Sequence, residues 1–321
     1  MRSVVVSAFG GLEALALVDV PDPTASAGHV LVDVRVSGLN FVDVYQRTGL
    51  YPLPLPLACG VEGVGTVRAV GDGVADVHAG QRVGWLSGGQ GSFGDMVVVT
   101  ADRAVPIPDE IDDVTAVALL MQGVTAHYLV TDTFHIKPGD VALVHAAAGG
   151  VGLLLTQMIT HLGGIVIATA STEAKRDAAR AAGAVHALPY EDFAVAVREL
   201  TDGTGVDVVY DGVGAATFDG SLASVRPRGL LVCFGNASGP VPPLDVLRLS
   251  QGGSLYVTRP TVAHYARTAA ELRARAADLF AWVEQGVLRV TPPTRYSRDD
   301  VVEAFRALES RQTTGKVVLV H

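Results

Sequence analysis

The stretch that decides the fold is residues 141–155, with the sequence VALVHAAAGGVGLLL. Its first residues, 141–144, form a short apolar run typical of a buried strand, and its last residues are typical of the start of a helix. The small-residue turn between them fits the dinucleotide fingerprint G-x-G-x-x-G, with Ala147 in the place of the first glycine, followed by Gly149 and Gly152. The N-terminus of a helix offers unpaired N–H groups and partial positive charge, which bind phosphate. By itself the pattern also fits an ordinary tight turn.

Composition and charge describe a compact chain that is long enough for two domains. The 321 residues are 49% hydrophobic and 18% charged, as in folded proteins. The net charge is −9 and the sequence has no run of lysine or arginine, so nucleic-acid binding is not expected to be the main function. Cys59 and Cys233 are expected to be buried free thiols. No apolar run of membrane-spanning length and no full signal peptide stand out, so we expect a cytoplasmic protein.

The first third of the chain, to about residue 105, is rich in predicted strands. Their spacing, with glycine-rich turns between them, predicts a small barrel. Val30–Val36 alternates apolar and polar residues, so it is expected to be half-buried. A short helix is predicted over 40–48, and the prolines between 52 and 56 require extended backbone. The predicted strands are 4–8, 15–20, 30–36, 60–70, 81–86 and 93–100.

From about residue 112 strands and helices alternate, which predicts a doubly wound parallel sheet. Two helices, 112–121 and 125–133, come before the strand–turn–helix of residues 141–162. One long helix is expected over 262–285. A helix at 297–308 and a strand at 316–320 leave the alternating pattern, and we expect them to fold back onto the barrel. The remaining strands are predicted at 165–170, 185–188, 207–211, 230–234 and 254–257, and the remaining helices at 172–182, 191–201 and 217–225.

The βαβ context gives the fingerprint turn the surroundings that a dinucleotide site requires. Enzymes that use NAD place a carboxylate at the end of the second strand, where it binds the ribose 2′-hydroxyl. Here that strand end carries no carboxylate, and Ser171 and Lys175 follow it. A hydroxyl and a positive charge suit a 2′-phosphate, so the sequence favours NADPH over NADH. The alternative for Lys175 is a solvated lysine on a helix surface.

Two further loops follow predicted parallel strands, at 211–214 and at 234–236. Ligands bind at the carboxyl ends of such strands, so both loops are expected to flank the nicotinamide half of the dinucleotide. Asn236 is a candidate hydrogen-bond partner there, although a turn asparagine is an equally good reading.

A set of motifs in this order and spacing resembles the medium-chain dehydrogenase/reductase superfamily over nearly the whole chain. More narrowly, it resembles the zinc-independent quinone oxidoreductases of the zeta-crystallin group. The matching stretches are NFVDVY at 40–45 with GLYP at 49–52, GVEGVG at 60–65, MQGVTA at 121–126, HAAAGGVG at 145–152, VYDGVG at 209–214, FGN at 234–236, SLYVTRP at 254–260 and TGKVV at 314–318.

The resemblance implies an α/β architecture of two domains. Residues 1–125 with 263–321 would form a discontinuous GroES-like catalytic domain that holds the substrate, and residues 126–262 a Rossmann domain that holds NADPH. In the family pattern Ser171, Lys175 and Tyr190 surround the 2′-phosphate, although many relatives carry glycine at the Ser171 position. The implied cofactor contacts are Asn40, Thr125, Gly149, Gly150, Val151, Ser171, Lys175, Tyr190, Phe234, Asn236, Arg259 and Arg311.

The ligands that hold catalytic zinc in the alcohol-dehydrogenase branch are missing from this sequence. That branch binds zinc through Cys, His and Cys. In this sequence the region of the first cysteine is Gly38–Asn40, Val61 replaces the histidine, and residues 121–123 contain no cysteine. Because zinc needs about three such ligands, no metal is expected. Without a Lewis acid, direct hydride transfer from NADPH to an electron-poor acceptor is the chemistry that remains. Asn40, Tyr45 and Tyr51 are the candidate substrate-pocket residues, and no essential acid or base is assigned; for either tyrosine, ordinary barrel packing is the alternative.

The leading hypothesis is an NADPH:quinone oxidoreductase that takes a small planar substrate. An NADPH-dependent alkene reductase acting on enones, enals or haloacrylates is the second, because both reactions need a planar acceptor in an apolar pocket. An NADPH-binding RNA-binding or structural protein is the third, and the acidic balance disfavours its RNA version. The predicted strands at 230–234 and 254–257 form a sheet edge at which relatives pair, so a homodimer is expected.

Overall fold

The computed structural model describes residues Met1–His321, which divide into two compact units. Unit 1 contains Met1–Val124, Thr268–Ala281 and Val290–His321, and unit 2 contains Thr125–Arg267 and Trp282–Arg289. Each unit has its own sheet system and its own apolar core.

Unit 2 is built on a six-stranded sheet in the order β11-β10-β9-β12-β13-β14, in which every neighbouring pair is parallel. Counted from β9, this is the strand order 3-2-1-4-5-6 of dinucleotide-binding folds. The doubly wound parallel sheet is therefore confirmed. The strands are β9 (Val141–Val144), β10 (Ile165–Thr169), β11 (His186–Leu188), β12 (Val206–Asp211), β13 (Val225–Cys233) and β14 (Tyr256–Thr258).

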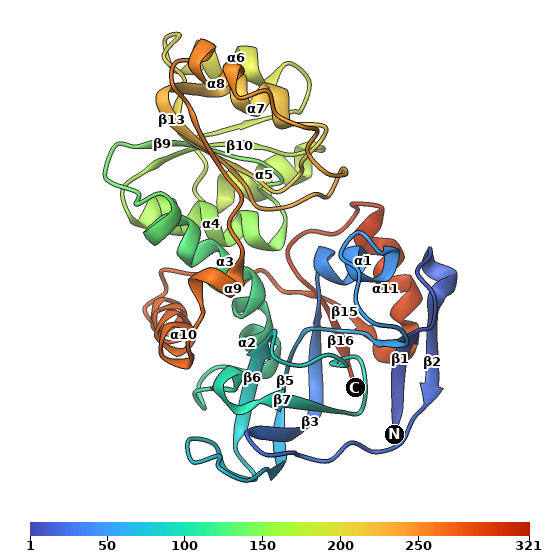
Figure 1. The fold of residues 1–321 in the computed structure, drawn as a ribbon. Helices are drawn as coiled ribbons and strands as arrows, with labels where there is room; N and C mark the ends of the chain where they lie inside the picture. Colours follow the sequence, from blue (N-terminus) through green and yellow to red (C-terminus); the bar gives the residue numbers. More distant parts are fainter. The chain divides into compact units, whose positions relative to one another are not determined.

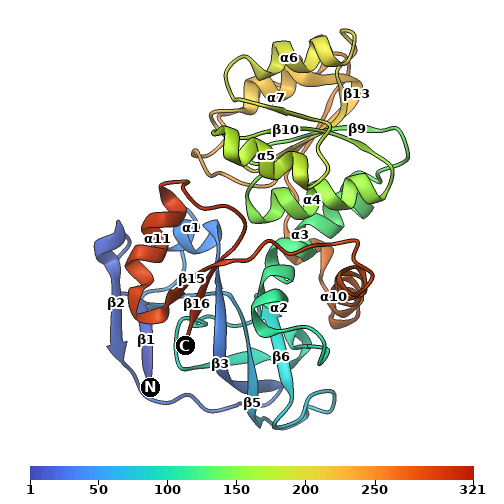
Figure 2. The same ribbon diagram turned by 180° about the vertical axis from the view of Figure 1, so that it is seen from behind.

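Helices cover both faces of this sheet, as Figures 1 and 2 show from opposite sides. Helices α4 (Gly150–His161) and α5 (Glu173–Ala181) lie on one face, and α6 (Phe193–Leu200) and α7 (Phe218–Ser224) lie on the other. Phe193 and Phe218 pack with Leu143 and Val209 of the sheet in one buried cluster. The unit also contains the second half of α3 (Met121–Tyr128), a π-helical turn (Leu129–Thr133), α8 (Leu247–Gln251) and α9 (Val262–Tyr265). Trp282 packs against the rings of His127 and His161.

Unit 1 has a seven-stranded sheet, in which β15-β16-β3-β5-β6-β8 pair in that order and β7 also pairs with β3, and a three-stranded sheet β2-β1-β4. The long strand β3 is central, because β16, β5 and β7 all pair with it. Trp85 is fully buried in the core and donates from Nε1 to Ser92 Oγ at 2.9 Å. The strands are β1 (Arg2–Val6), β2 (Leu15–Asp19), β3 (His29–Leu39), β4 (Leu57–Ala58), β5 (Glu62–Val70), β6 (Arg82–Leu86), β7 (Met96–Thr100), β8 (Val105–Pro106), β15 (Thr294–Ser297) and β16 (Val317–Val320).

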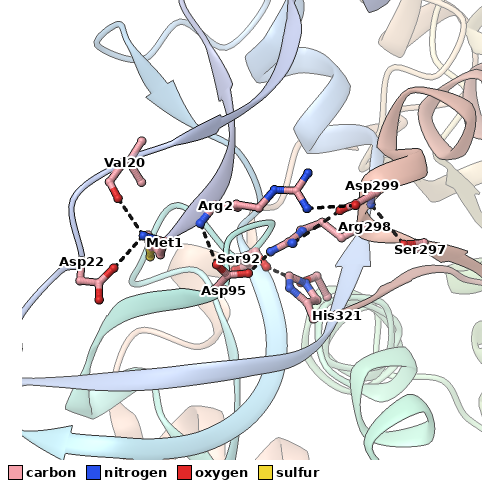
Figure 3. A network of polar contacts seen from close by, with 11 residues as sticks. Met1, Arg2, Val20, Asp22, Ser92, Asp95, Ser297, Arg298, Asp299 and His321 are labelled. Atoms are coloured by element: carbon pink, nitrogen blue, oxygen red, sulfur yellow. Dashed lines mark hydrogen bonds and ion pairs between the residues drawn. The ribbon is translucent and has the colours of Figure 1, made fainter.

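The last segment of the chain is part of unit 1. Strand β16 pairs with β3, and a polar network joins the segment to the first strand (Figure 3). Asp95 accepts from the Arg2 backbone N–H at 2.7 Å and is ion-paired with Arg298, while Arg2 reaches Asp299 at 3.0 Å. Residues 290–321 therefore fold with the N-terminal strands. The helices of this unit are α1 (Phe41–Thr48), α2 (Asp113–Leu119), α10 (Ala269–Glu284, its first thirteen residues) and α11 (Val301–Glu309).

The structure differs from the sequence expectations at several elements. The single helix expected over 262–285 is two helices, because Thr268 and Glu271 form a capping box that starts α10: the Glu271 N–H donates to Thr268 Oγ1 and the Thr268 N–H to Glu271 Oε2. Over Val30–Val36 strand β3 shows the expected half-burial, because Val32, Val34 and Val36 are buried while Asp33 and Arg35 are not, and its last residues, Ser37–Leu39, are buried on both faces. Short strands β4, β8 and β15 were not expected.

The stretch Asp113–Thr133 is long and apolar enough to cross a membrane by length and composition. The expectation that no stretch reaches that length is therefore wrong. Of its most apolar window, 67% is buried inside the protein, and core helices of soluble proteins pass the same criterion, so it is weak evidence for a membrane span.

Candidate functional site

The fingerprint turn lies at the carboxyl edge of the unit 2 sheet. The Ala147 N–H donates to Thr169 O of β10, and the His145 N–H donates to Tyr210 O of β12, so the turn sits between three strand ends. Gly149 is the N-cap of α4, and Gly150 and Val151 form its first turn. Backbone N–H groups at this position have no partner within the helix. The residues therefore present the donors and the helix-dipole charge that a pyrophosphate requires.

Close packing explains the last glycine of the fingerprint. A Cβ at Gly152 would lie 2.4 Å from Ala146 O and 2.7 Å from Ala147 Cα, which are backbone atoms that cannot move aside cheaply. Ala146 itself has a left-handed φ of 49°, an uncommon conformation for a residue with a side chain. The turn is thus held tightly against the helix start.

The next strand end carries the pair expected to bind a 2′-phosphate. Ser171 follows β10 and is exposed, and Lys175 lies in the first turn of α5. Thr172 caps this helix by accepting the Lys175 backbone N–H at 3.3 Å, which leaves the lysine side chain outside the cap. Burial lowers the pKa of Lys175. Glu173 is ion-paired with Arg176 and Arg180, so its charge is already matched within α5.

Tyr190 joins the fingerprint turn to the loop after β11. Its hydroxyl accepts the Ala146 N–H at 3.1 Å, and its ring stacks on His145 with centroids 6.2 Å apart. The structure thus brings Tyr190 to the turn that contains Gly149.

The remaining predicted residues of unit 2 follow other strands or helices. Phe234 and Asn236 come directly after β13, and the Phe234 N–H donates to Asp211 O at 2.8 Å, so the loops after β12 and β13 meet. Arg259 follows β14 and donates from Nη1 to Cys233 O at 2.7 Å. Thr125 is half-buried in α3.

A buried Ser–His–Asp chain supports the edge of the unit 2 sheet. The Ser221 hydroxyl donates to Asp211 Oδ2 at 2.7 Å and lies 2.9 Å from His145 Nε2, while Thr169 Oγ1 lies 2.7 Å from His145 Nδ1. Since the single Ser221 hydrogen goes to the carboxylate, Nε2 carries the imidazole proton and Nδ1 accepts from Thr169. Burial lowers the pKa of His145 to about 4, so the ring is neutral at physiological pH. Ser221 is fully buried and donates away from the imidazole, so this chain is structural and not a nucleophile.

Asn40, one of the candidate residues of unit 1, lies at a buried ion pair. Lys316 Nζ contacts Glu62 Oε2 at 2.5 Å, with side chains 1% and 0% exposed. Asn40 lies against both groups: its Oδ1 accepts from Lys316 at 2.7 Å, and its Nδ2 donates to Glu62 Oε2 at 2.8 Å. Glu62 Oε1 accepts the Met121 backbone N–H at 2.5 Å. Four segments far apart in the sequence therefore meet at this pair.

Asp43 adds a second carboxylate beside this cluster. Its Oδ2 accepts the Asn40 backbone N–H at 2.8 Å in the capping box that starts α1, and its Oδ1 is buried without a hydrogen-bond partner. Burial raises the pKa of Asp43 to about 7, against the lowering effects of the Asn40 N–H and of Lys316. This side chain therefore titrates near neutral pH.

The two tyrosines proposed for the pocket lie together on the same segment. Tyr45 of α1 is buried in an apolar cluster, whereas Tyr51 is 39% exposed, and their rings meet edge to face with centroids 5.1 Å apart. Tyr45 therefore does pack in the core, and Tyr51 is the better placed of the two to reach a ligand. Arg311 is exposed in the loop after α11, with a left-handed φ of 57°.

The donor set of unit 1 does not fit a zinc ion. Asn40 and Val61 supply no thiolate or imidazole, Glu62 is paired with Lys316, and Asp43 accepts the Asn40 backbone N–H in the capping box of α1. No group of three or more His, Cys, Asp or Glu side chains in the chain is placed to hold a metal ion. Cys59 lies nearby but is a free thiol, and burial raises its pKa to about 12, so it is not a ready thiolate ligand.

Sequence reasoning missed the roles of Lys316, Asp43 and Glu62. In the sequence, Glu62 and Lys316 stand out only as members of the motifs at 60–65 and 314–318. The sequence does contain a pattern that points to Asp43: an asparagine followed three positions later by an acidic residue, as in Asn40 and Asp43, is typical of a capping box. The Glu62–Lys316 pair had no comparable signal, because its members are 254 residues apart.

The sequence and the structure of this chain are similar to those of known proteins. Residues 26–109 match the family described as the alcohol dehydrogenase GroES-like domain, and residues 150–282 match the family described as zinc-binding dehydrogenase. A quinone oxidoreductase of Pseudomonas aeruginosa is 42% identical over 99% of both chains. A 2-haloacrylate reductase of a Burkholderia species is 37% identical over 100% of this chain and 99% of its own. The structure of an Escherichia coli quinone oxidoreductase complexed with NADPH superposes with a TM-score of 0.97, at 37% identity and full coverage of both chains.

Proposed function

Because the chain belongs to the zeta-crystallin-like quinone oxidoreductase family of the medium-chain dehydrogenase/reductase superfamily, we propose that it reduces quinones with NADPH by direct hydride transfer without a metal. The main support for NADPH as the cofactor is that the fingerprint turn and the residues Ser171 and Lys175 follow two adjacent strands of one parallel sheet. When bound, NADPH supplies the hydride, and the protein supplies binding and orientation.

The assignment of domains follows the two compact units. We propose that residues 126–262 bind NADPH and that residues 1–125 with 263–321 form the catalytic domain. The units support this division with boundaries near 125 and 267, and they differ from it in that residues 282–289 belong with unit 2.

We propose the cofactor-binding residues in two sets, one on each unit. Gly149, Gly150 and Val151 bind the pyrophosphate, and Ser171, Lys175 and Tyr190 bind the 2′-phosphate. The other cofactor contacts proposed on unit 2 are Thr125, Phe234, Asn236 and Arg259, and those on unit 1 are Asn40 and Arg311.

The acceptor is proposed to bind beside Tyr51. Reduction of a quinone places negative charge on its oxygens, and a phenol can donate a hydrogen bond to such an oxygen. The buried ring of Tyr45 holds Tyr51 edge to face, which limits its orientations. Since the metal-ligand residues are missing, substrate orientation and charge stabilisation fall to such side chains.

The test is steady-state kinetics with the purified protein. NADPH with 1,4-benzoquinone is expected to turn over, NADH to be a much poorer donor, and EDTA to leave the rate unchanged. Full activity with NADH and none with NADPH contradicts the cofactor assignment, and loss of activity in EDTA that zinc restores contradicts the metal-free mechanism.

Reduction of an activated alkene is the second candidate, favoured by the 37% identity to a 2-haloacrylate reductase. It uses the same hydride and protonates the neighbouring carbon. The same assay with 2-chloroacrylate and an enone, followed by product analysis, separates the two activities. A higher kcat/KM for the alkene than for the quinone would make alkene reduction the main activity.

We further propose that the protein is a cytoplasmic homodimer. Two buried cysteines without a disulfide suit a reducing compartment. Strand β14 is the edge of the unit 2 sheet and pairs only with β13, which leaves one row of its backbone groups to pair with a second copy.

A further inference from the structure

The imidazole of His145 connects several elements of unit 2 at the start of the fingerprint turn. Its Nδ1 lies 2.7 Å from Thr169 Oγ1 at the end of β10, and its Nε2 lies 2.9 Å from Ser221 Oγ of α7. Its backbone N–H donates to Tyr210 O of β12 at 3.1 Å. His145 is 1% exposed, and Thr169 and Ser221 are fully buried. Because the next residue, Ala146, is the left-handed residue of the turn, these bonds fix the point at which the turn begins.

The carboxylate of Asp211 holds the loop that follows β12. Its Oδ1 accepts the backbone N–H of Val213 at 2.8 Å and that of Gly214 at 3.0 Å. Its Oδ2 accepts the hydroxyls of Thr217 and Ser221, both at 2.7 Å. Four donors fill the acceptor positions of an ionised carboxylate. The loop at 211–214 is therefore held by the same buried carboxylate to which Ser221 is bound.

The hydrogen bonds run in one direction through a buried chain, which consists of Thr169, His145, Ser221 and Asp211. Thr169 donates to His145, and His145 donates through Nε2 to Ser221. Ser221 donates in turn to Asp211. A carboxylate only accepts, so reversing the chain would leave the oxygens of Ser221 and Asp211 facing each other without a hydrogen. A buried polar chain in which every member is paired makes its surroundings rigid, so the fingerprint turn and the loop at 211–214 are linked in one arrangement.

We propose that His145 and Ser221 are positioning residues that hold the fingerprint turn and the loop at 211–214 at a fixed spacing, so that both halves of the nicotinamide nucleotide are bound at once. This inference rests on the proposed function, with the turn at the pyrophosphate and the loop beside the nicotinamide half. Neither residue contacts the nucleotide itself, because both are buried. A ligand that reaches both loops therefore gains from the fixed spacing, and a ligand that reaches the turn alone does not.

The test variant is Ser221→Ala, which interrupts the buried chain. It takes the acceptor from His145 Nε2 and one donor from Asp211, and it removes a single oxygen atom, so the variant is expected to fold. The matched control is Ser224→Ala on the same helix. Ser224 is also fully buried, but its hydroxyl donates at 2.8 Å to Gly220 O within α7 and takes no part in the chain. His145→Leu, alone and combined with Ser221→Ala, completes a mutant cycle.

The measurements are the Kd of NADPH, the Kd of 2′,5′-ADP and the melting temperature. The fragment 2′,5′-ADP contains the 2′-phosphate and one phosphate of the pyrophosphate bridge, but it has no nicotinamide half. In Ser221→Ala the NADPH Kd is expected to rise about fivefold, which corresponds to one hydrogen bond, while the Kd of 2′,5′-ADP is expected to stay within about twofold of the wild-type value. Ser224→Ala is expected to shift the melting temperature alone. The double variant is expected to bind NADPH no more weakly than His145→Leu does.

Three results would overturn the inference while the proposed function stands. They are a folded Ser221→Ala protein that binds NADPH as the wild type does or loses equal affinity for both ligands, losses that multiply in the double variant, and a Ser224→Ala protein that loses as much NADPH affinity as Ser221→Ala. A wild-type protein that binds no NADPH overturns the proposed function and the inference with it.

If Ser221→Ala does not fold, the tautomer of His145 in the wild-type protein decides. Nitrogen NMR of the histidine rings distinguishes the two neutral tautomers, and the His145 signals are assigned by their absence in His145→Leu. The form with the proton on Nε2 is expected, with slow exchange of that proton in the free protein. The form with the proton on Nδ1 would overturn the inference, because Ser221 would then donate to the ring and not to Asp211.

Discussion

Gly149 and Gly152 lie in the same turn but are glycine for different reasons. A Cβ at Gly152 would collide with backbone atoms of Ala146 and Ala147, whereas a Cβ at Gly149 would meet only Ala146 O, at 3.1 Å, and its φ of −77° suits any residue. Gly152 is therefore required by packing. Gly149 is open toward the place where a phosphate would bind.

We predict that Gly152→Ala destabilises the protein by about 1–3 kcal/mol, as overpacking does. Gly149→Ala is expected to keep the melting temperature within a few degrees and to weaken NADPH binding on the order of tenfold, because its methyl group would displace the pyrophosphate. Thermal unfolding and NADPH titration of both variants check this. Equal destabilisation of the two variants would contradict the assignment.

Asp43 predicts an unusual pH dependence of stability. Its folded pKa of about 7 exceeds the ordinary value of 3.8, so between these values the folded state binds more protons than the unfolded state, and stability falls as pH rises. The charged groups nearby are Lys316 and Glu62. In Asp43→Asn this contribution is absent.

We therefore expect Asp43→Asn to gain stability relative to the wild type as pH rises from about 4 to about 7, by about 1.4 kcal/mol per pH unit, with a constant difference above that window. Urea unfolding of both proteins at several pH values measures it. A difference that does not change with pH would show that Asp43 is not perturbed in the folded protein.

At the scale of single elements, the start of α5 is proposed to determine the choice between NADPH and NADH. The cap hydrogen bond of α5 uses the Lys175 backbone N–H, which a substitution of the side chain retains. We predict that Lys175→Ala lowers kcat/KM for NADPH about ten- to hundredfold, the value of a charged hydrogen bond, and leaves kcat/KM for NADH unchanged.

Arg248→Ala is the control for this prediction, because it removes the same charge from unit 2 at α8, where Arg248 pairs with Asp219 and not with a residue of α5. Its ratio of kcat/KM for NADPH to that for NADH should equal the wild-type ratio. A similar loss in both variants would indicate a general effect of charge and not a 2′-phosphate contact.

The elements that the sequence predicted well are those whose signals are local. The parallel sheet of unit 2 follows from alternating strands and helices, and the position of α4 follows from the glycine pattern. The break before α10 also had a local signal, the Thr268–Glu271 capping box, which outweighed the helical period across it. Strand β15 gave no such signal, because it is defined by pairing with β16, more than twenty residues further along.

The candidate site divides in the same way. Its proposed phosphate-binding residues could be located from strand ends and motif spacing. The hydrogen bonds of Asn40 could not, because Glu62 and Lys316 are brought to it only by the folded chain. Tyr45 was ambiguous from sequence, since an aromatic residue on a short helix packs equally well in a core or against a ligand, and the structure shows it in the core.

At the scale of the whole molecule, the proposed homodimer depends on the edge strand β14. Tyr256 on this strand is 63% exposed. A lysine there opposes edge pairing, so Tyr256→Lys is expected to change a dimeric mass into a monomeric one in light scattering. Val185→Lys, at a position 60% exposed beside the opposite edge strand β11, is expected to leave the mass unchanged. If the Tyr256→Lys protein stays dimeric, the dimer interface is not at β14.

The two tryptophans of the chain are divided between its halves: Trp85 belongs to unit 1 and Trp282 to unit 2. Each half thus contains one intrinsic fluorophore, and the two differ in surroundings. Trp85 is fully buried in an apolar core. The ring centroid of Trp282 lies 5.4 Å from that of His127 and 5.7 Å from that of His161. Trp85→Phe and Trp282→Phe proteins would therefore each emit from a single half, and the loss of structure in the two halves can be followed as two separate optical signals.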